Sequence, residues 1–396
     1  MSPSPKPLIA DRFAAFGTTI FAEMTALANQ HRAVNLSQGF PDFDGPDLGK
    51  NAAAKAIADG HNQYAPLHGV QVLREAIAGW ASRVSGIDCD PDREITVTSG
   101  CTEAIAATML GLLNPGDEVV VFEPYYDSYR ACLAMADATP RFVTMHPTPE
   151  GFAYHPEELR AAFGPKTRAV LINTPHNPTG AVLSVAQLDE IAALCKEHNA
   201  IAISDEVYER LTYDDRTHIS IATRPGMRER TIVLSSSGKS FSLTGWKIGW
   251  AIAPEPLTRG IRMAHQFLTF DVATPLQHGI AALLTDGEPE IEKLRAHYTH
   301  TRSLLAEALQ ELGFELALPQ GSYFILADHT PVSQRLGLKT DVDLCRWLPE
   351  HAGVAAIPPS AFYHDPSDGA ALVRFAFCKR TKTIDEAIKR LRTALT

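Results

Sequence analysis

Residues 235–250 have the sequence SSSGKSFSLTGWKIGW and lie between two short runs of apolar, largely β-branched residues. The flanking runs, 231–234 and 248–252, predict two strands joined by a polar loop. The loop carries two lysines, Lys239 and Lys247. A single lysine amine is most often a solvated charge, but in a partly desolvated pocket it is a nucleophile for a carbonyl carbon. The loop alone does not decide between these two interpretations.

The strand-and-loop pattern continues on the N-terminal side of this loop. Apolar runs predict strands at residues 94–98, 118–122, 141–145, 168–172, 201–204, 231–234 and 248–252. Helical spacing of apolar residues separates most of these runs. Such alternation predicts an α/β fold with a mostly parallel central sheet and helices on both faces.

The pattern changes after about residue 285, which predicts a second, smaller domain. A long helix over residues 289–312 is followed by a final α+β region with strands expected at 314–317, 320–327, 354–357 and 372–377. We therefore expect three parts, with the N-terminal arm packing on the small domain. They are residues 1–45 as the arm, 46–285 as the large cofactor-binding α/β domain, and 286–396 as the small C-terminal α+β domain.

Charge and composition exclude several functional classes. The formal net charge is −10 and no basic stripe is present, which argues against nucleic acid as a partner. No apolar run has the length of a membrane span, and residues 1–7 lack the apolar core of a signal peptide, so we expect a cytoplasmic protein with no membrane partner. The six scattered cysteines form no CxxC pair, which is typical of a reduced protein without a metal site.

In an open parallel sheet, ligands bind beyond the carboxyl ends of the strands, and two polar segments follow such ends here. Residues 99–102, Ser-Gly-Cys-Thr, join a strand to a helix, where backbone N–H groups and the helix dipole can hold a phosphate. A plain helix cap by Ser99 is the alternative. Residues 173–180, NTPHNPTG, form a turn-rich segment with more polar side chains than a turn requires.

Two other strand ends carry aromatic and acidic residues. Tyr125 and Tyr126 could cover a flat ring or simply fill the core. Asp205 ends an apolar strand, where a carboxylate is costly unless it is paired; a protonated ring nitrogen would pair with it, and a helix cap is the alternative. Tyr208 follows three residues later. Together these segments predict a site for a small aromatic phosphate with an aldehyde that meets a lysine.

Five motifs, in this order and spacing, resemble the pyridoxal-phosphate-dependent class I/II aminotransferases of fold type I. They occupy residues 99–101, 173–180, 204–208, 236–241 and 244–250. The resemblance runs almost end to end, from NLSQGFPDF at 35–43 to VRFAF at 373–377. Within that family the chain is most similar to the branch that holds methionine aminotransferase and the kynurenine/glutamine transaminases, through residues 35–43, 127–129 and 355–363.

The resemblance implies a pyridoxal 5′-phosphate (PLP) cofactor and a role for each matching residue. Lys239 would form the Schiff base with the cofactor and then move the Cα proton of the substrate, while Asp205 would bond the pyridine nitrogen. The other implied cofactor contacts are Gly100, Cys101, Thr102, Ser236 and Lys247 at the phosphate, Asn177 and Tyr208 at the ring hydroxyl, Tyr125 stacked on the ring, and Tyr64 arriving from the second subunit of a homodimer.

The resemblance also implies how amino-acid and 2-oxo-acid substrates are held. Arg374 would clamp the substrate carboxylate with its planar fork, helped by the backbone N–H of Gly39 and by Asn177. Phe21 is a candidate wall of the side-chain pocket. This chain departs from many relatives at Cys101, where they carry alanine, and from distant ones at Lys247, where they carry arginine. Neither departure changes the expected cofactor.

The donor is predicted from the residues expected near the substrate side chain. Residues 265–270 are aromatic and neutral, and no motif identifies a second cation for a distal carboxylate. We therefore expect large uncharged donors, methionine first, then phenylalanine, tyrosine, glutamine or kynurenine. The alternatives on the same fold are a kynurenine–oxoglutarate/glutamine transaminase and a cysteine-conjugate β-lyase.

Two rivals from other classes are disfavoured by the sequence. A transcription regulator built on such a domain would need an added basic helix-turn-helix segment, which the sequence does not show. A catalytically inactive homologue would not be expected to retain the lysine, aspartate and arginine.

Overall fold

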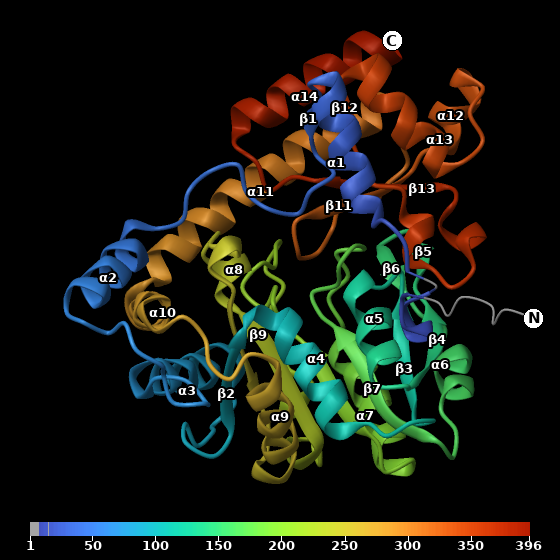
Figure 1. Ribbon diagram of the computed structural model, residues 1–396. Helices are drawn as coiled ribbons and strands as arrows, with labels where there is room; N and C mark the ends of the chain where they lie inside the picture. Colours follow the sequence, from blue (N-terminus) through green and yellow to red (C-terminus); the bar gives the residue numbers. More distant parts are fainter. Residues whose placement is uncertain (1–7, 15) are drawn as a thin grey trace, which may run out of the picture.

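The computed structural model describes residues 8–14 and 16–396 (Figure 1). Residues 1–7, for which the sequence predicts no signal peptide, lie outside the described residues. Within the described ranges, no helix has both the length and the hydropathy needed to cross a membrane.

A seven-stranded sheet forms the centre of the larger part of the molecule. Its strands, in spatial order, are β2 (Ile95–Ser99), β10 (Ile248–Ile252), β9 (Thr231–Ser236), β8 (Ile201–Asp205), β7 (Thr167–Asn173), β3 (Glu118–Glu123) and β4 (Thr139–Thr144). Neighbouring strands from β9 to β4 pair in parallel, whereas β10 is antiparallel to both β2 and β9. The predicted mostly parallel α/β sheet is confirmed, with one reversed strand.

The apolar strand sequences follow from burial on both faces of this sheet. Along β3, Val119 and Val121 pack into one hydrophobic cluster, while Val120 and Phe122 pack into another on the opposite face. Successive side chains of a strand point to opposite faces, so a strand covered on both sides must be apolar throughout.

Helices cover the two faces and one edge of the sheet (Figure 1). The first cluster includes residues of α4 (Gly100–Leu112) and α5 (Asp127–Met135), and the second includes residues of α6 (Pro156–Ala162) and α7 (Val185–Glu197). A third cluster joins β2 and β10 to α3 (Gln71–Ser85) and α10 (Thr274–Asp286). Beyond these, α2 (Asp47–Ala58) packs on α10, and α9 (Glu255–Leu268) packs on α4.

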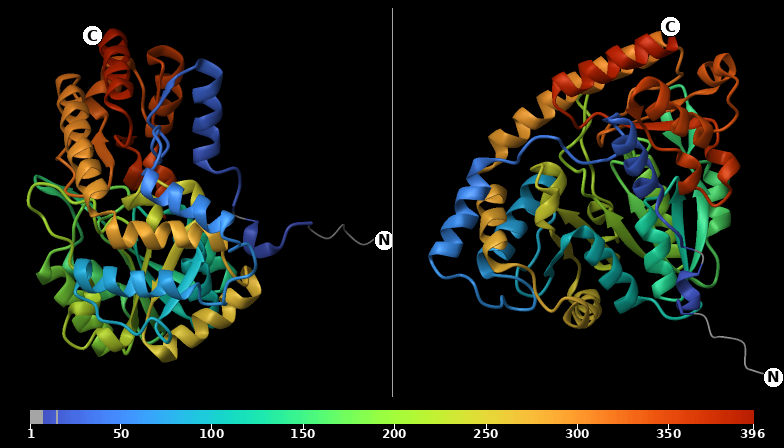
Figure 2. Two further views of the ribbon diagram at one scale, coloured as in Figure 1. Left: turned by 90° about the vertical axis from the view of Figure 1, so that its left-hand side faces the viewer. Right: turned by 45° about the horizontal axis from the view of Figure 1, so that its top comes forward.

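The C-terminal elements form a separate layer above the carboxyl edge of the sheet, together with the start of the chain (Figures 1 and 2). β11 (Phe324–Asp328) pairs with β13 (Leu372–Ala376), and β1 (Val34–Asn35) pairs with β12 (Val354–Ala355). The N-terminal arm therefore packs with the C-terminal elements. The helices of this layer are α1 (Ile20–His31), α11 (Glu288–Glu311), α12 (Thr330–Leu336), α13 (Asp341–Trp347) and α14 (Thr381–Leu395).

The structure departs from the predicted elements in a few places. The strand expected at 314–317 is absent, and only Glu315 bridges Asp328 there. A short hairpin, β5 (His146–Thr148) and β6 (Gly151–Ala153), was not predicted, because each strand is too short to show an apolar period.

Candidate active site

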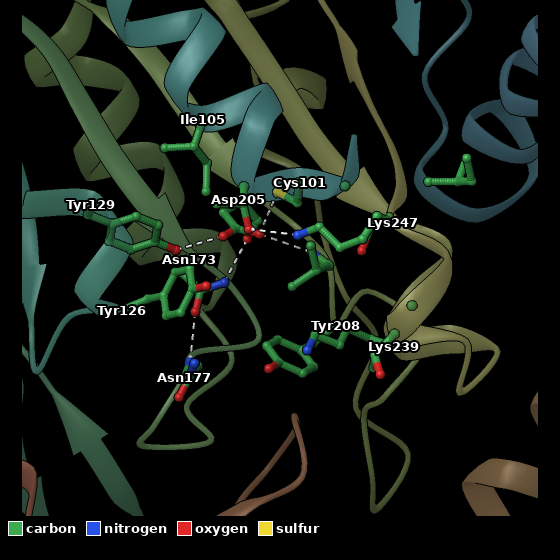
Figure 3. A pocket seen from close by; sticks show the side chains of 17 residues that line it. Cys101, Ile105, Tyr126, Tyr129, Asn173, Asn177, Asp205, Tyr208, Lys239 and Lys247 are labelled. Carbon is green, nitrogen blue, oxygen red and sulfur yellow. Dashed lines mark hydrogen bonds between the residues drawn. The ribbon is translucent and has the colours of Figure 1, made fainter. Parts of the chain in front are cut away.

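The predicted site residues converge on one cavity beyond the carboxyl ends of β2, β7, β8 and β9 (Figure 3). The predicted residues that line it are Gly100, Cys101, Thr102, Asn177, Asp205, Tyr208, Ser236, Lys239 and Lys247. They come from chain segments far apart in sequence and meet because parallel strands end at a common edge.

One wall of the cavity is the N-terminus of α4. The Ser99 side chain makes no capping hydrogen bond, so the alternative of a helix capped by that hydroxyl does not hold. Gly100 has φ +70°, and strand β10 approaches so closely that a Cβ on Gly249 would lie 2.5 Å from the Cys101 nitrogen. Lys247 Nζ lies 3.4 Å from Thr102 Oγ1. Backbone N–H groups, a hydroxyl and an amine at a helix N-terminus make an anion site.

A second wall holds the carboxylate of Asp205 between three donors (Figure 3). The Tyr129 hydroxyl donates to Oδ2 at 2.7 Å, the Val207 N–H donates to Oδ1 at 3.3 Å, and Cys101 Sγ lies 3.7 Å from Oδ1. Burial raises the pKa of Asp205, and these donors oppose the rise by stabilising the charged form. The hydrogen bond from the Val207 N–H, two residues along the chain, is of the kind that a helix cap makes. The Asp205 side chain nevertheless also lines the cavity.

Lys239 lies at the end of β9, in the single turn α8 (Ser237–Ser240). Its Nζ lies 5.6 Å from the centre of the Tyr323 ring and 5.9 Å from that of Tyr208. Burial lowers the pKa of Lys239 below its usual range. A lysine in such surroundings is more often neutral, which is the form that attacks a carbonyl carbon or accepts a proton.

Arg374 is a buried cation beside this cavity. Its Nη1 donates to Asn177 Oδ1 at 3.2 Å and its Nη2 to the Ser37 carbonyl at 2.9 Å, while its Nε has no partner among the described residues. Burial lowers the pKa of Arg374 to about 10, so it remains charged at neutral pH. In the part of the chain that the structure describes, no carboxylate forms an ion pair with it. A buried charge without a counter-ion is costly, which makes this a place for an anionic ligand.

Phe21 lies next to that arginine, and Gly39 lies against Phe324, whose ring centre is 4.2 Å from the guanidinium carbon; neither lines the cavity. The guanidinium carbon of Arg374 sits 5.2 Å from the centre of the Phe21 ring. Gly39 accepts a hydrogen bond from the Tyr323 hydroxyl through its carbonyl, and a Cβ there would meet the Phe324 ring at 2.6 Å. Both positions are consistent with a substrate pocket around Arg374.

Two predicted residues lie away from the cavity. Tyr125 stacks on Phe142 with ring centres 5.5 Å apart and donates its hydroxyl hydrogen to the Tyr363 carbonyl. Its neighbour Tyr126 lines the cavity instead, because adjacent residues before α5 point in different directions. Tyr64 is 83% exposed and packs edge-on against Phe270.

The sequence did not single out Tyr129 or Asn173. The Asn173 side chain donates to the Asp205 carbonyl at 2.9 Å and accepts from the Asn177 N–H at 2.7 Å, so it braces two predicted residues. Tyr126 and Tyr129 are three residues apart at the start of a helix, which places them on one face. That spacing is the signal in the sequence that could have identified Tyr129.

Comparison with known proteins identifies the family. Residues 31–391 match the family model for aminotransferases of class I and II. The chain belongs to this family. The resemblance of its five motifs is therefore confirmed, and the family is one that uses PLP.

Several aminotransferases are similar to this chain over nearly its whole length. A probable N-succinyldiaminopimelate aminotransferase, DapC, of Mycobacterium tuberculosis is 47% identical and aligns with 97% of this chain and 98% of its own length. The methionine aminotransferase of Escherichia coli is 42% identical and aligns with 98% of both chains. The kynurenine–oxoglutarate transaminase of Dictyostelium discoideum is 37% identical over 94% of this chain and 93% of its own length.

Solved aminotransferase structures have the same fold. The N-succinyldiaminopimelate aminotransferase of M. tuberculosis superposes with a TM-score of 0.94, covering 98% of this chain and all of that one. The E. coli methionine aminotransferase YbdL gives 0.92 with the same coverage. An aspartate aminotransferase of Thermus thermophilus, 32% identical, still gives 0.90 and covers 98% of this chain and all of that one. Enzymes with different donors thus share this fold, so the fold does not identify the donor.

Proposed function

We propose that this aminotransferase uses PLP, with Lys239 as the lysine that holds the cofactor and Asp205 as the partner of its ring nitrogen. The observation that carries the proposal is the convergence of a buried carboxylate, a desolvated amine and an uncapped helix N-terminus on one cavity. These groups match a protonated ring nitrogen, an aldehyde and a phosphate in turn.

The residues around the cavity fit the rest of the cofactor. Lys247 and the first turn of α4 supply cationic and N–H contacts for the phosphate, and Tyr126 has the place in the cavity that the sequence assigned to Tyr125. When bound, PLP supplies an electron sink that eases removal of a proton from the substrate Cα. The remaining proposed contacts are Gly100, Cys101, Thr102 and Ser236 at the phosphate, and Asn177 and Tyr208 at the ring hydroxyl.

Lys239 and Arg374 have different roles toward the substrate, one in proton transfer and one in binding. The Lys239 amine accepts the proton from the substrate Cα, a role that its lowered pKa favours near neutral pH. Arg374 holds the α-carboxylate through a guanidinium already oriented by Ser37 and Asn177. Gly39 and Phe21 border the same pocket. Fixing the carboxylate limits the positions that the Cα can take relative to Lys239.

We propose a homodimer in which Tyr64 completes the site of the partner subunit. Three large side chains, Tyr64, Phe267 and Phe270, are exposed in the single chain, the first two by more than 80%. Apolar groups gathered in this way are typical of a protein interface. Size-exclusion chromatography with light scattering tests the dimer, and a monomeric active enzyme would contradict it.

Large uncharged amino acids, methionine first, are the proposed donors. The aromatic rings of Phe21 and Phe362 beside Arg374 support this, as do Tyr126 in the cavity and the E. coli methionine aminotransferase. N-succinyldiaminopimelate is the second candidate. It is supported by the M. tuberculosis relative, which the sequence did not predict, and by an arginine-containing groove described below.

A donor and acceptor panel on purified, PLP-loaded protein tests the function. Methionine with 2-oxo acids should give transamination above aspartate, and a marked preference for aspartate would overturn the proposed donor class. Release of pyruvate from cysteine conjugates without an oxo-acid acceptor would instead indicate the β-lyase alternative. A protein that binds no PLP and transaminates no donor would refute the function itself.

A further inference from the structure

A second cavity, of about 540 Å³, lies beside the candidate active site. The N-terminal arm, the start of α5 and the turn at 359–362 form its walls. It shares Tyr126 with the first cavity, and it shares Phe362 with the surroundings of Arg374, because Phe362 stacks on Phe21 at 5.5 Å and lies 5.5 Å from the guanidinium carbon. We call this second cavity the arm groove. It adjoins the pocket in which a substrate side chain would lie.

The arm groove has aromatic walls and one arginine. Phe13, Phe16 and Phe362 contribute rings, and Arg130 lies 5.9 Å from the centre of the Phe16 ring. Arg130 Nη1 donates to the Tyr125 hydroxyl at 3.0 Å, and no carboxylate of the described chain lies within ion-pair distance of it. A guanidinium has five N–H donors in a planar fork, so most of its donors are available to an anion.

Asp127 lies one helical turn before Arg130 and also lines the groove. Burial raises the pKa of this carboxyl group, while the charge of Arg374 acts in the opposite direction. Asp127 and Arg130 are three residues apart on α5, so the groove carries one acidic and one basic side chain. A carboxylate close to Asp127 is repelled, whereas one at Arg130 is attracted.

We propose that the arm groove receives the far end of the amino donor, and that Arg130 binds a carboxylate there. This proposal rests on the function proposed above and adds to its donors α-amino acids with a long apolar stem and a terminal carboxylate. The aromatic walls suit the stem. Arg130 lies in the arm groove and not in the first cavity, so we expect the groove to select for longer donors than aspartate and glutamate.

The test compares two donors of the same carbon number, L-2-aminopimelate, which ends in a carboxylate, and L-2-aminoheptanoate, which ends in a methyl group. The readout is the ratio of their kcat/KM values with a common oxo-acid acceptor. We expect the native enzyme to favour aminopimelate over aminoheptanoate, and over aspartate and glutamate. Arg130→Gln should lower the aminopimelate-to-aminoheptanoate ratio by about 10- to 100-fold, as expected for one hydrogen-bonded charge.

Two control variants separate binding from a structural role. Tyr125→Phe breaks the same hydrogen bond but keeps the Arg130 charge, and should leave the ratio high. Arg141→Gln removes an equal charge from exposed β4, outside the groove, and should also leave it high. A fall in the ratio with either control variant equal to that with Arg130→Gln would overturn the proposal.

The outcomes also separate this inference from the proposed function. If the native enzyme transaminates methionine and shows its PLP absorption but does not favour aminopimelate, the arm groove proposal alone fails. If no donor reacts and no PLP binds, the proposed function fails, and this inference fails with it.

Discussion

The hydroxyl of Tyr129 donates a 2.7 Å hydrogen bond to Oδ2 of Asp205, and both side chains are buried. The bond joins the first turn of α5 to the end of β8, two segments far apart in sequence. It stabilises the ionised form of a carboxylate whose burial would otherwise favour the neutral form. The proposed partner of the cofactor ring nitrogen is therefore itself held by a side chain from another element.

Tyr129→Phe should weaken PLP binding about 10-fold, because one hydrogen bond to a charged group is lost and the pKa of Asp205 rises. The dissociation constant can be measured by fluorescence titration of the apoenzyme. The matched control is Tyr154→Phe, which removes a hydroxyl bonded to Glu190 at 3.1 Å on the other face of the sheet. Equal PLP affinities for native enzyme and Tyr129→Phe would contradict the role of this bond.

The two lysines of residues 235–250 should behave differently when replaced. Lys239→Ala should abolish the visible absorption of the bound cofactor and reduce transamination by at least about 10³-fold, because a nucleophile and a general base are lost together. Lys247→Ala should keep the absorption band and raise the PLP dissociation constant about 10-fold through the lost phosphate contact. The reverse pattern in the absorption spectra would show that the roles are exchanged.

Gly249→Ala should destabilise the protein by about 1–3 kcal/mol, because the new Cβ would lie 2.5 Å from the backbone of Gly100 and Cys101. The same shift should displace the N-terminus of α4 and weaken phosphate binding. Chemical denaturation and PLP titration measure the two effects. Gly245→Ala is the control, since a Cβ there meets no atom within 4 Å. Two variants of equal stability would contradict the close approach of β10 to α4.

The raised pKa of Glu209 predicts that the stability of the protein depends on pH. Burial raises its pKa to about 7 from an ordinary 4.5, although the Ser235 hydroxyl donates to it and His218 lies near, while Glu206 adds to the rise. Between these two pKa values the folded chain binds more protons than the unfolded chain. The free energy of unfolding therefore falls as pH rises from 4.5 to 7, by about 3 kcal/mol from this residue.

Glu209→Gln cannot ionise and should lack this fall. Relative to the native protein, the variant should gain about 3 kcal/mol between pH 4.5 and pH 8, measured by urea denaturation across that range. Exposed Glu229→Gln serves as the control, and a Glu209→Gln difference that stays flat with pH would rule out the raised pKa.

The sequence predicted the central strands well because they are buried on both faces and read as nearly continuous apolar runs. The predicted strand at 248–252 coincides with β10, and the one at 201–204 lacks only Asp205 of β8. An apolar run carries no information about direction, so the reversal of β10 could not be predicted. The domain boundary near residue 285 stays a prediction.

A site residue could be predicted from the sequence where it stands in a distinctive motif. It could not be predicted with certainty where two adjacent residues are of the same type. Asp205, Asn177 and Lys239 each stand in a distinctive segment, and all three line the cavity. Tyr125 and Tyr126 are identical side chains, and only the backbone at the start of α5 decides which one enters the cavity. Arg130 has no motif at all. Its importance comes from the N-terminal arm, which lies more than a hundred residues away in sequence and forms the groove around it.

The antiparallel direction of β10 also bears on the order in which the site assembles. Because β10 runs back beside β9, residues 237–247 form a short connection that brings both lysines to the same edge. Closing so short a loop costs little chain entropy, whereas Asp205 and Asn177 reach that edge only after helical crossovers between parallel strands. The two lysines are thus brought together by a local connection, whereas the carboxylate and amide that face them reach the site only through long-range folding.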